Sequence, residues 1–269
     1  MERKINNLSI CYTLFLILLF FSGALSGALS EIVKYLAYIL PFALGLFFIR
    51  EEASFDKNYI TLDKEKVKFT LPIIFPTVVS VMLVSVITSL LVKLVGGKEN
   101  NVDVGNELIP ALISHALVPA LFEEVLFRYL PMRMLKNHSG KLVILVSSVF
   151  FALIHHSLYS IPYAFVAGVV FMAIDLACDS VIPSFLLHFI NNAISVGMLV
   201  YKDNPLFAPT ILTLVVALAL VSLIYIAFNK TKYIDRLAKV LEGEEMISLT
   251  PSAIVFGVAC IFIAIVSIL

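Results

Sequence analysis

The sequence predicts an all-α fold, a polytopic bundle of eight or nine transmembrane helices. Of its 269 residues, 61% are hydrophobic and only 14% are charged, with a mean hydropathy of +1.02. A soluble domain carries about 25% charged residues, because its surface faces water. Apolar runs of about 18 residues or more recur along the whole chain, and each is long enough to cross a bilayer. The chain is therefore expected to be a multi-pass protein of the cell membrane.

Polar segments and prolines mark where the predicted spans end. The short breaks near Ser160 and Ser180 are followed by Pro162 and Pro183, and proline suits the first turn of a new helix. The last predicted span is the least secure, because the acidic segment before it suits the membrane interface. The predicted spans are 9–29, 33–49, 70–95, 107–131, 142–159, 162–178, 181–200, 207–228 and 251–269.

The first span has an alternative interpretation as a cleaved signal peptide. Arg3 and Lys4 precede an apolar run that ends in the small-residue stretch 23–30, in which Ala28-Leu29-Ser30 resembles a cleavage site. The next span follows almost at once, which favours an uncleaved first helix.

The distribution of basic residues predicts the orientation of the chain. With the N-terminus in the cytoplasm, 14 lysines and arginines lie on the inner side and four on the outer side. Cytoplasmic loops carry such an excess of basic residues. The inner residues are Arg3, Lys4, Arg50, Lys57, Lys64, Lys66, Lys68, Arg133, Lys136, Lys141, Lys230, Lys232, Arg236 and Lys239; the outer ones are Lys34, Lys93, Lys98 and Lys202.

Charge and cysteine content bear on partners and cofactors. The formal net charge is zero, so nothing indicates nucleic-acid binding. The lipid bilayer is the expected surrounding. Cys11, Cys178 and Cys260 lie singly in or beside apolar segments, and they are interpreted as small buried residues, since no pair has metal-binding spacing. No cofactor is expected.

The first polar cluster lies inside the fourth predicted span and contains Glu123, Glu124 and Arg128. Charged residues within a bilayer face the bundle interior and usually have a function. Glu124 and Arg128 are four residues apart with the acid first, which favours an ion pair. Glu123 points about 100° away and is left unpaired, which suits a general base. The alternative is that Arg128 serves both acids as a structural link.

Two further clusters contain histidine. Phe151 and His155 share one helix face in the fifth span, and the neighbouring His156 points elsewhere. His188 and Asn192 share a face in the seventh span, where an imidazole and a carboxamide offer two donors to a developing oxyanion. Alone, a membrane histidine such as His155 is more often a hydrogen-bonding group between helices than a catalyst, and the His188–Asn192 cluster alone is equally consistent with that structural role. Together with Glu123, they suit attack of an activated water on an amide.

These clusters resemble the CPBP family of CAAX proteases and bacteriocin-processing enzymes, also called the Abi family. The family pattern is Glu-Glu-x-x-x-Arg, Phe-x-x-x-His and His-x-x-x-Asn/Asp. Here it reads Glu123-Glu124…Arg128, Phe151…His155 and His188…Asn192, in that order. The resemblance covers about residues 107–197, taken as the protease core. The segments 1–106 and 198–269 are taken as N-terminal spans of unassigned role and C-terminal spans.

The resemblance implies a fold, an activity and roles for residues. It implies a cavity open toward the cytoplasm and a metal-independent, glutamate-dependent endopeptidase. Glu123 and His155 would activate the water, His188 and Asn192 would form the oxyanion hole, and Glu124 and Arg128 would support them. The substrate would be a peptide or a membrane-associated protein. Eukaryotic members cleave prenylated CAAX proteins, whereas prokaryotic relatives are linked to bacteriocin self-immunity, peptide pheromones and surface-protein display.

Several alternatives remain open. Glu123, His155 and His188 offer three zinc ligands, although no His-Glu-x-x-His occurs. No Gly-x-Gly-Asp occurs for an aspartyl protease using Asp175 or Asp179. A transporter would also contain buried acids and histidines, but no inverted repeat is present. A non-catalytic scaffold or bacteriocin-immunity protein would keep the same fold.

Overall fold

The computed structural model describes residues 2–50, 57–94, 104–155, 157–243 and 250–266, and this part of the chain contains helices but no strand. Five consecutive elements, α4 to α6, form one helix of 27 residues, Leu108–Met134, in which η2 and η3 are π-helical turns. The elements are α1 (Glu2–Ala24), α2 (Gly27–Ile49), the 3₁₀ turn η1 (Lys57–Ile60), α3 (Lys64–Leu94), α4 (Leu108–Leu112), η2 (Ile113–Leu117), α5 (Val118–Glu124), η3 (Val125–Tyr129), α6 (Leu130–Met134), α7 (Gly140–Leu153), α8 (Ser160–Cys178), α9 (Ile182–Val200), α10 (Phe207–Phe228), α11 (Lys230–Val240) and α12 (Pro251–Val266).

Within the described residues, seven helices are long and apolar enough to cross a membrane. The predicted spans 142–159 and 251–269 correspond to the shorter helices α7 and α12. The first break also lies earlier than predicted, because Ser26 is extended and Gly27 adopts a positive φ of 62° between α1 and α2. The prediction of an all-helical, multi-pass membrane fold is confirmed, and the boundaries shift by several residues.

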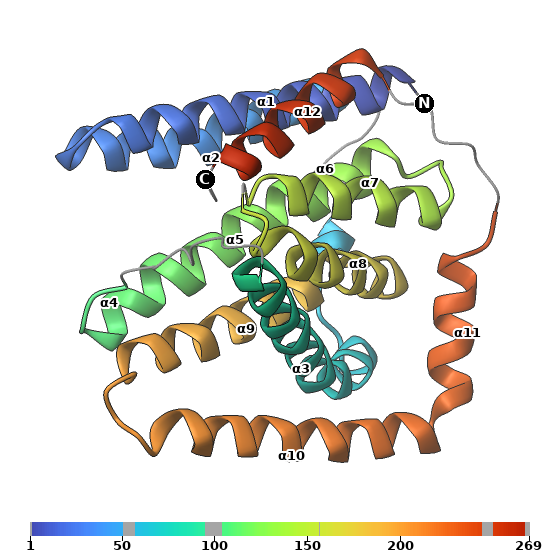
Figure 1. Cartoon of the computed structure of the whole chain (residues 1–269). Helices are drawn as coiled ribbons and strands as arrows, with labels where there is room; N and C mark the ends of the chain where they lie inside the picture. The colour runs from blue at the N-terminus through green and yellow to red at the C-terminus, as the bar shows by residue number, and fades with distance from the viewer. Residues whose placement is uncertain (1, 51–56, 95–103, 156, 244–249, 267–269) are drawn as a thin grey trace.

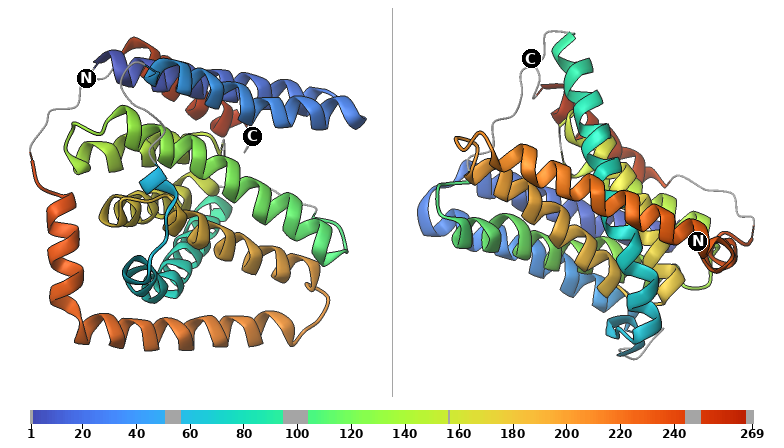
Figure 2. Two further views of the ribbon diagram at one scale, coloured as in Figure 1. Left: turned by 180° about the vertical axis from the view of Figure 1, so that it is seen from behind. Right: turned by 90° about the horizontal axis from the view of Figure 1, so that it is seen from below.

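The helices form layers around the long helix Leu108–Met134 (Figure 1). The antiparallel pair α1 and α2, with α12 beside it, covers one side, and α10 with α11 frames the opposite side. Between them, α7, α8, α9 and α3 surround the middle of the long helix, and the views from behind and below show the same order (Figure 2). Residues in the middle of the chain are therefore enclosed by segments from both ends.

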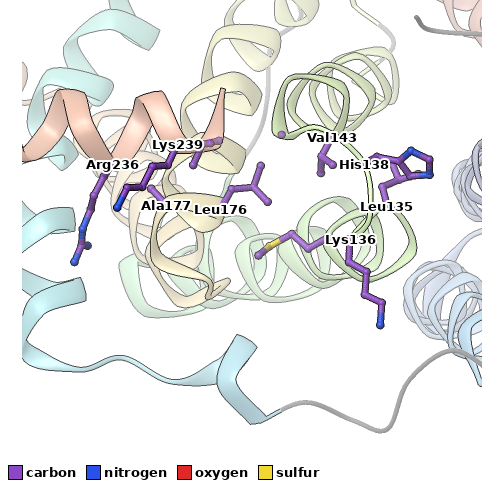
Figure 3. Close-up of a pocket in the computed structure, with 11 residues that line it drawn as sticks. Leu135, Lys136, His138, Val143, Leu176, Ala177, Arg236 and Lys239 are labelled. Atoms are coloured by element: carbon purple, nitrogen blue, oxygen red, sulfur yellow. The ribbon is translucent and has the colours of Figure 1, made fainter. Parts of the chain in front are cut away.

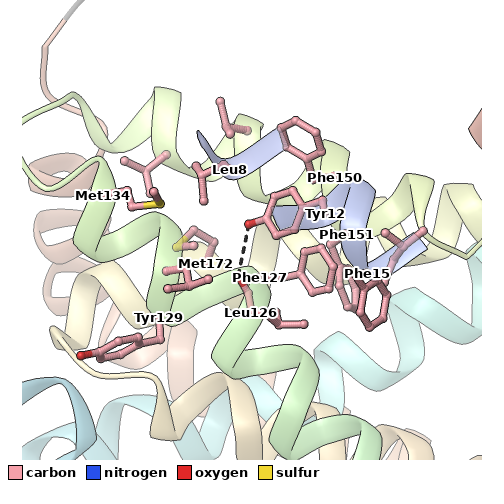
Figure 4. Close-up of a cluster of buried hydrophobic side chains, with 14 of the residues drawn as sticks. Leu8, Tyr12, Phe15, Leu126, Phe127, Tyr129, Met134, Phe150, Phe151 and Met172 are labelled. Carbon is pink, nitrogen blue, oxygen red and sulfur yellow. Dashed lines mark hydrogen bonds between the residues drawn. The ribbon is translucent and has the colours of Figure 1, made fainter. Parts of the chain in front are cut away.

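The N-terminal helix packs directly behind the glutamate-bearing helix. Tyr12 of α1 is fully buried, its ring stacks on Phe127 at 4.7 Å, and its hydroxyl donates to the Leu126 carbonyl oxygen at 3.1 Å (Figure 4). Phe127 contacts Phe151 at 5.7 Å between ring centroids. A continuous set of aromatic contacts thus connects α1 to the site, and this gives the N-terminal spans a supporting role.

Prolines explain the irregular long helix. Proline has no N–H to offer the carbonyl four residues earlier, and its ring clashes with that carbonyl. Each π turn ends two residues before a proline, η2 before Pro119 and η3 before Pro131. The affected carbonyls belong to His115 and Phe127, and both lie inside the π turns. The wider turns accommodate the proline rings, and they occur on either side of the glutamates. Such π turns are frequent at functional sites.

Candidate active site

Glu123 and Glu124 end α5, but they occupy different environments. Glu123 lies on the wall of a cavity of about 670 Å³, and 13% of its side chain is exposed. The Glu124 side chain is only 2% exposed and lies behind the wall. The Tyr38 hydroxyl of α2 approaches the Glu123 carboxylate. Glu123 is therefore the acid that a substrate in the cavity can reach.

Glu124 contacts Arg128 and His188 at once. Its Oε2 lies 3.2 Å from Arg128 Nε, as the spacing predicted, and its Oε1 lies 2.6 Å from His188 Nδ1. The Arg128 nitrogens make no hydrogen bond within the described residues, and the guanidinium lies over the Phe151 ring at 4.3 Å. Coulombic attraction and a cation–π contact thus hold Arg128, without the aligned N–H···O bonds of a forked pair. Glu124 positions His188, a contact that the sequence did not predict.

His188 lies between the two glutamates. Its Nδ1 donates to Glu124, and its Nε2 is 3.9 Å from Glu123 Oε2, beyond direct hydrogen-bond distance. With Nδ1 protonated, Nε2 is an acceptor in the neutral ring and a donor in the imidazolium form. The donor role predicted for His188 therefore requires the charged ring.

His155 follows α7 and is not part of that helix. The helix ends at Leu153, and the His155 Nδ1 donates to the Phe151 carbonyl oxygen at 2.8 Å. This bond leaves Nε2 as the basic nitrogen of the neutral ring. The ring lines the same cavity as Glu123. His155 thus lies just beyond the end of α7, whereas the predicted span 142–159 placed it inside a helix; His156 lies outside the described residues.

Asn192 is held by the backbone carbonyl of His115. This carbonyl lies four residues before Pro119 and lacks its usual helical partner, because proline has no N–H. Its Nδ2 donates to the His115 carbonyl oxygen at 3.4 Å, and its Oδ1 accepts from Asn191 Nδ2 at 3.2 Å. Asn192 and His188 both line the cavity from α9. The irregular η2 turn therefore positions one of the two predicted oxyanion donors.

The structure brings Glu123, His155, His188 and Asn192 to one cavity and places Glu124 and Arg128 behind them. Their chemical roles stay predictions. Sequence reasoning did not identify Tyr38 and His115, whose proximity depends on tertiary packing, nor Asp175 as a supporting residue.

Asp175 was visible as an intramembrane acid but was considered only as an aspartyl-protease residue. It is fully buried in α8, and its Oδ1 accepts from the Ser184 backbone N–H at 2.9 Å. This contact caps the start of α9, the helix that carries His188. Asp175 therefore helps to set the position of α9.

Metal-ligand geometry is absent from the part of the chain that the structure describes: no three His, Cys, Asp or Glu side chains are grouped to hold an ion. The prediction of a metal-independent reaction is untested by this observation.

The fold and this cluster define a class: a helical multi-pass membrane protein with a carboxylate–histidine site in an internal cavity. Residues 105–194 match the family model described as type II CAAX prenyl endopeptidase Rce1-like. The matched segment holds every predicted site residue, and the match agrees with the family that the sequence motifs resemble. No curated protein and no solved structure gives a significant match.

Proposed function

We propose that the protein is an intramembrane, glutamate-dependent and metal-independent endopeptidase that cleaves a peptide or membrane-associated protein with an activated water. The observation that carries the proposal is Glu123. It is the acid on the cavity wall, 3.9 Å from His188 Nε2, while Glu124 is engaged with Arg128 and His188. The Rce1-like domain at residues 105–194 supports an endopeptidase of the CAAX-protease type.

In the proposed reaction, Glu123 and the basic Nε2 of His155 orient a water molecule. Glu123 removes a proton as the water oxygen attacks the carbonyl carbon of the scissile peptide bond. His188 Nε2–H and the Asn192 carboxamide stabilise the oxyanion, and each such donor contributes about 10²–10³-fold in rate. Glu123 then returns the proton to the leaving nitrogen as the carbon–nitrogen bond breaks. Peptide and water are consumed, and a carboxylic acid and an amine are released.

The direct test replaces Glu123 with glutamine, which keeps the shape and removes the base. We expect Glu123→Gln to lower turnover by about 10²-fold or more, the scale of general-base catalysis, with unchanged thermal unfolding. Glu107→Gln is the matched control, because Glu107 is an exposed acid just before the same long helix. Full activity in Glu123→Gln would end the proposal.

The same variant can identify the substrate. Membrane proteomics of peptide N-termini and C-termini would compare wild-type cells with a chromosomal Glu123→Gln strain. Uncut precursors that accumulate in the mutant establish the protease and name its substrate. If the two strains are identical while a deletion strain has a phenotype, the non-catalytic scaffold or immunity function is correct.

A chelator distinguishes the proposed metal-independent reaction from zinc-dependent hydrolysis. Incubation of the purified protein with 1,10-phenanthroline, followed by its removal, should leave the cleavage rate unchanged, because the proposed nucleophile is activated by Glu123 and His155. A non-chelating phenanthroline isomer is the matched control. Activity that is lost with the chelator and restored by added Zn²⁺ would instead favour a site with three protein ligands.

A further inference from the structure

The cavity that holds the site draws its walls from one end of the bundle. Ser114 and His115 line it from the first half of the long helix, and Ser195 and Leu199 line it from the second half of α9. Lys34, near the start of α2, also contributes. In Figure 1 the beginning of α4, the end of α9 and the α1–α2 turn lie on the same side of the molecule, the left of that view. The cavity therefore extends toward that end.

The opposite end of the site is closed by packed side chains. Arg128, Leu130, Phe171 and Met172 are almost completely buried, with at most 1% of each residue exposed. They lie on the later part of the long helix and on α8, beyond the glutamates. Within the described residues, the site thus has a filled interior on one side and the cavity on the other.

Basic residues gather at the closed end. Arg133 and Lys136 lie at the end of α6 and in the turn that leads to α7, while Arg236 and Lys239 lie on α11. Lys136, Arg236 and Lys239 surround a second cavity of about 470 Å³, between α11 and the α6–α7 turn (Figure 3). In Figure 1 this turn and α11 lie on the right, away from the start of α4 and the end of α9.

We infer that the active-site cavity opens toward the non-cytoplasmic face, so that its substrate is a peptide segment presented from that side of the membrane. The basic end is the cytoplasmic one by the 14-to-4 distribution of basic residues, and the cavity opens at the other end. The inference rests on the proposed function where it calls the bound segment a substrate. The direction in which the cavity opens does not depend on that function. It reverses the cytoplasmic opening that the family resemblance implied, because that opening and a cytoplasmic basic end are incompatible in this fold.

The cavity wall indicates the kind of segment that fits. Ser114, Asn191 and Ser195 supply hydroxyl and amide groups, whereas Val81 and Met82 of α3 supply an apolar surface. Such a wall suits an uncharged, extended stretch whose backbone needs hydrogen-bond partners and whose side chains are aliphatic. The proposed substrate is therefore a segment of this chemistry in an exported peptide or in the outer flank of a membrane-anchored one.

Cysteine labelling tests the orientation without any assay of cleavage. Ser195→Cys places a thiol at an exposed position of the cavity wall, and Lys239→Cys places one at an exposed position of the basic end. The native cysteines 11, 178 and 260 are buried, so the wild-type protein provides the background signal. A membrane-impermeant maleimide is added to spheroplasts that express each variant, before and after permeabilisation.

The expected result is labelling of Ser195→Cys in intact spheroplasts and of Lys239→Cys only after permeabilisation. The reverse pattern overturns the inference, and so does a Ser195→Cys thiol that remains unlabelled even in permeabilised cells, since the cavity would then not open to water. External labelling of Ser195→Cys combined with an inactive wild-type enzyme refutes the proposed protease and leaves the orientation intact.

Discussion

Glu124 contacts both Arg128 and His188, which lie far apart from each other in the sequence, and its two contacts can be separated by mutation. Arg128 is fully buried, so removal of its carboxylate partner leaves an uncompensated charge. Breaking a buried pair in this way costs about 3–5 kcal/mol. The contact to His188 has a different effect, because it sets the orientation of an imidazole that lines the cavity.

We predict that Glu124→Gln strongly lowers thermal stability and that the double variant Glu124→Gln/Arg128→Met recovers most of it. The double variant removes both charges and leaves groups of similar size. Its cleavage rate should nevertheless stay low, because His188 no longer has a charged partner at Nδ1. Thermal unfolding in detergent and cleavage assays on Glu124→Gln, Arg128→Met and the double variant form a double-mutant cycle. A double variant with wild-type activity would show that Glu124 is structural only.

At the scale of single residues, the sequence predicted a contact between neighbours on one helix and did not predict contacts between residues far apart in the chain. The Glu124–Arg128 pair follows from helical spacing, and the structure contains it. The 2.6 Å contact between Glu124 and His188 joins residues 64 positions apart, so no periodicity indicates it. Family resemblance placed both residues in motifs without stating that they touch.

At the scale of the helix, prolines create acceptors that other helices use. Pro72, Pro119 and Pro131 each lie four residues after a carbonyl that accepts a bond from a side chain on another helix. A backbone carbonyl inside a membrane needs a partner, so these bonds connect helices where the helix's own bond is missing. The pairs are Tyr233 Oη with the Lys68 oxygen, Asn192 Nδ2 with the His115 oxygen, and Ser147 Oγ with the Phe127 oxygen.

We predict that Pro119→Ala lowers catalytic efficiency by about tenfold, less than the 10²–10³-fold expected when an oxyanion donor is lost outright. Alanine supplies an N–H to the His115 carbonyl, regularises η2 and weakens the tether of Asn192. Pro110→Ala is the matched control, because Pro110 lies in the first turn of the same helix, where the missing N–H has no intrahelical acceptor. Equal losses in the two variants, measured as kcat/KM, would contradict the role of the His115 carbonyl.

Hydropathy predicted the order of the apolar helices because it reports on the lipid-facing surface. Of the nine predicted spans, two correspond to the shorter helices α7 and α12, and the polar helix α11 was not predicted. It did not predict the π turns or the end of α7 at Leu153, which depend on contacts between helices. Prolines were used to mark helix starts at Pro162 and Pro183. Their effect inside the long helix was not considered, although Pro119 and Pro131 are visible in the sequence.

At the scale of the whole molecule, the last helix supports the first. Phe256 of α12 is almost completely buried, and its ring lies 5.1 Å from Phe150 of α7 and 6.4 Å from Tyr12 of α1. The same Tyr12 stacks on Phe127 beside the site. The first helix therefore packs against the glutamate-bearing helix, and α12 packs against α1 and α7, so both flanking segments contact the part of the chain that matches the Rce1-like family model.

We predict that Phe256→Ala destabilises the protein by about 3 kcal/mol, at the low end for a buried phenylalanine because lipid tails can fill part of the space. Val255→Ala is the matched control, since Val255 lies on the same helix and is 66% exposed; it should be nearly neutral. Thermal unfolding in detergent gives the stability, and a cleavage assay well below the unfolding temperature gives the activity. Because Phe256 contacts no site residue directly, activity at low temperature should persist in Phe256→Ala and decline earlier on heating. If Phe256→Ala and Val255→Ala unfold at the same temperature, α12 does not brace the core, and the site would depend on the central helices alone.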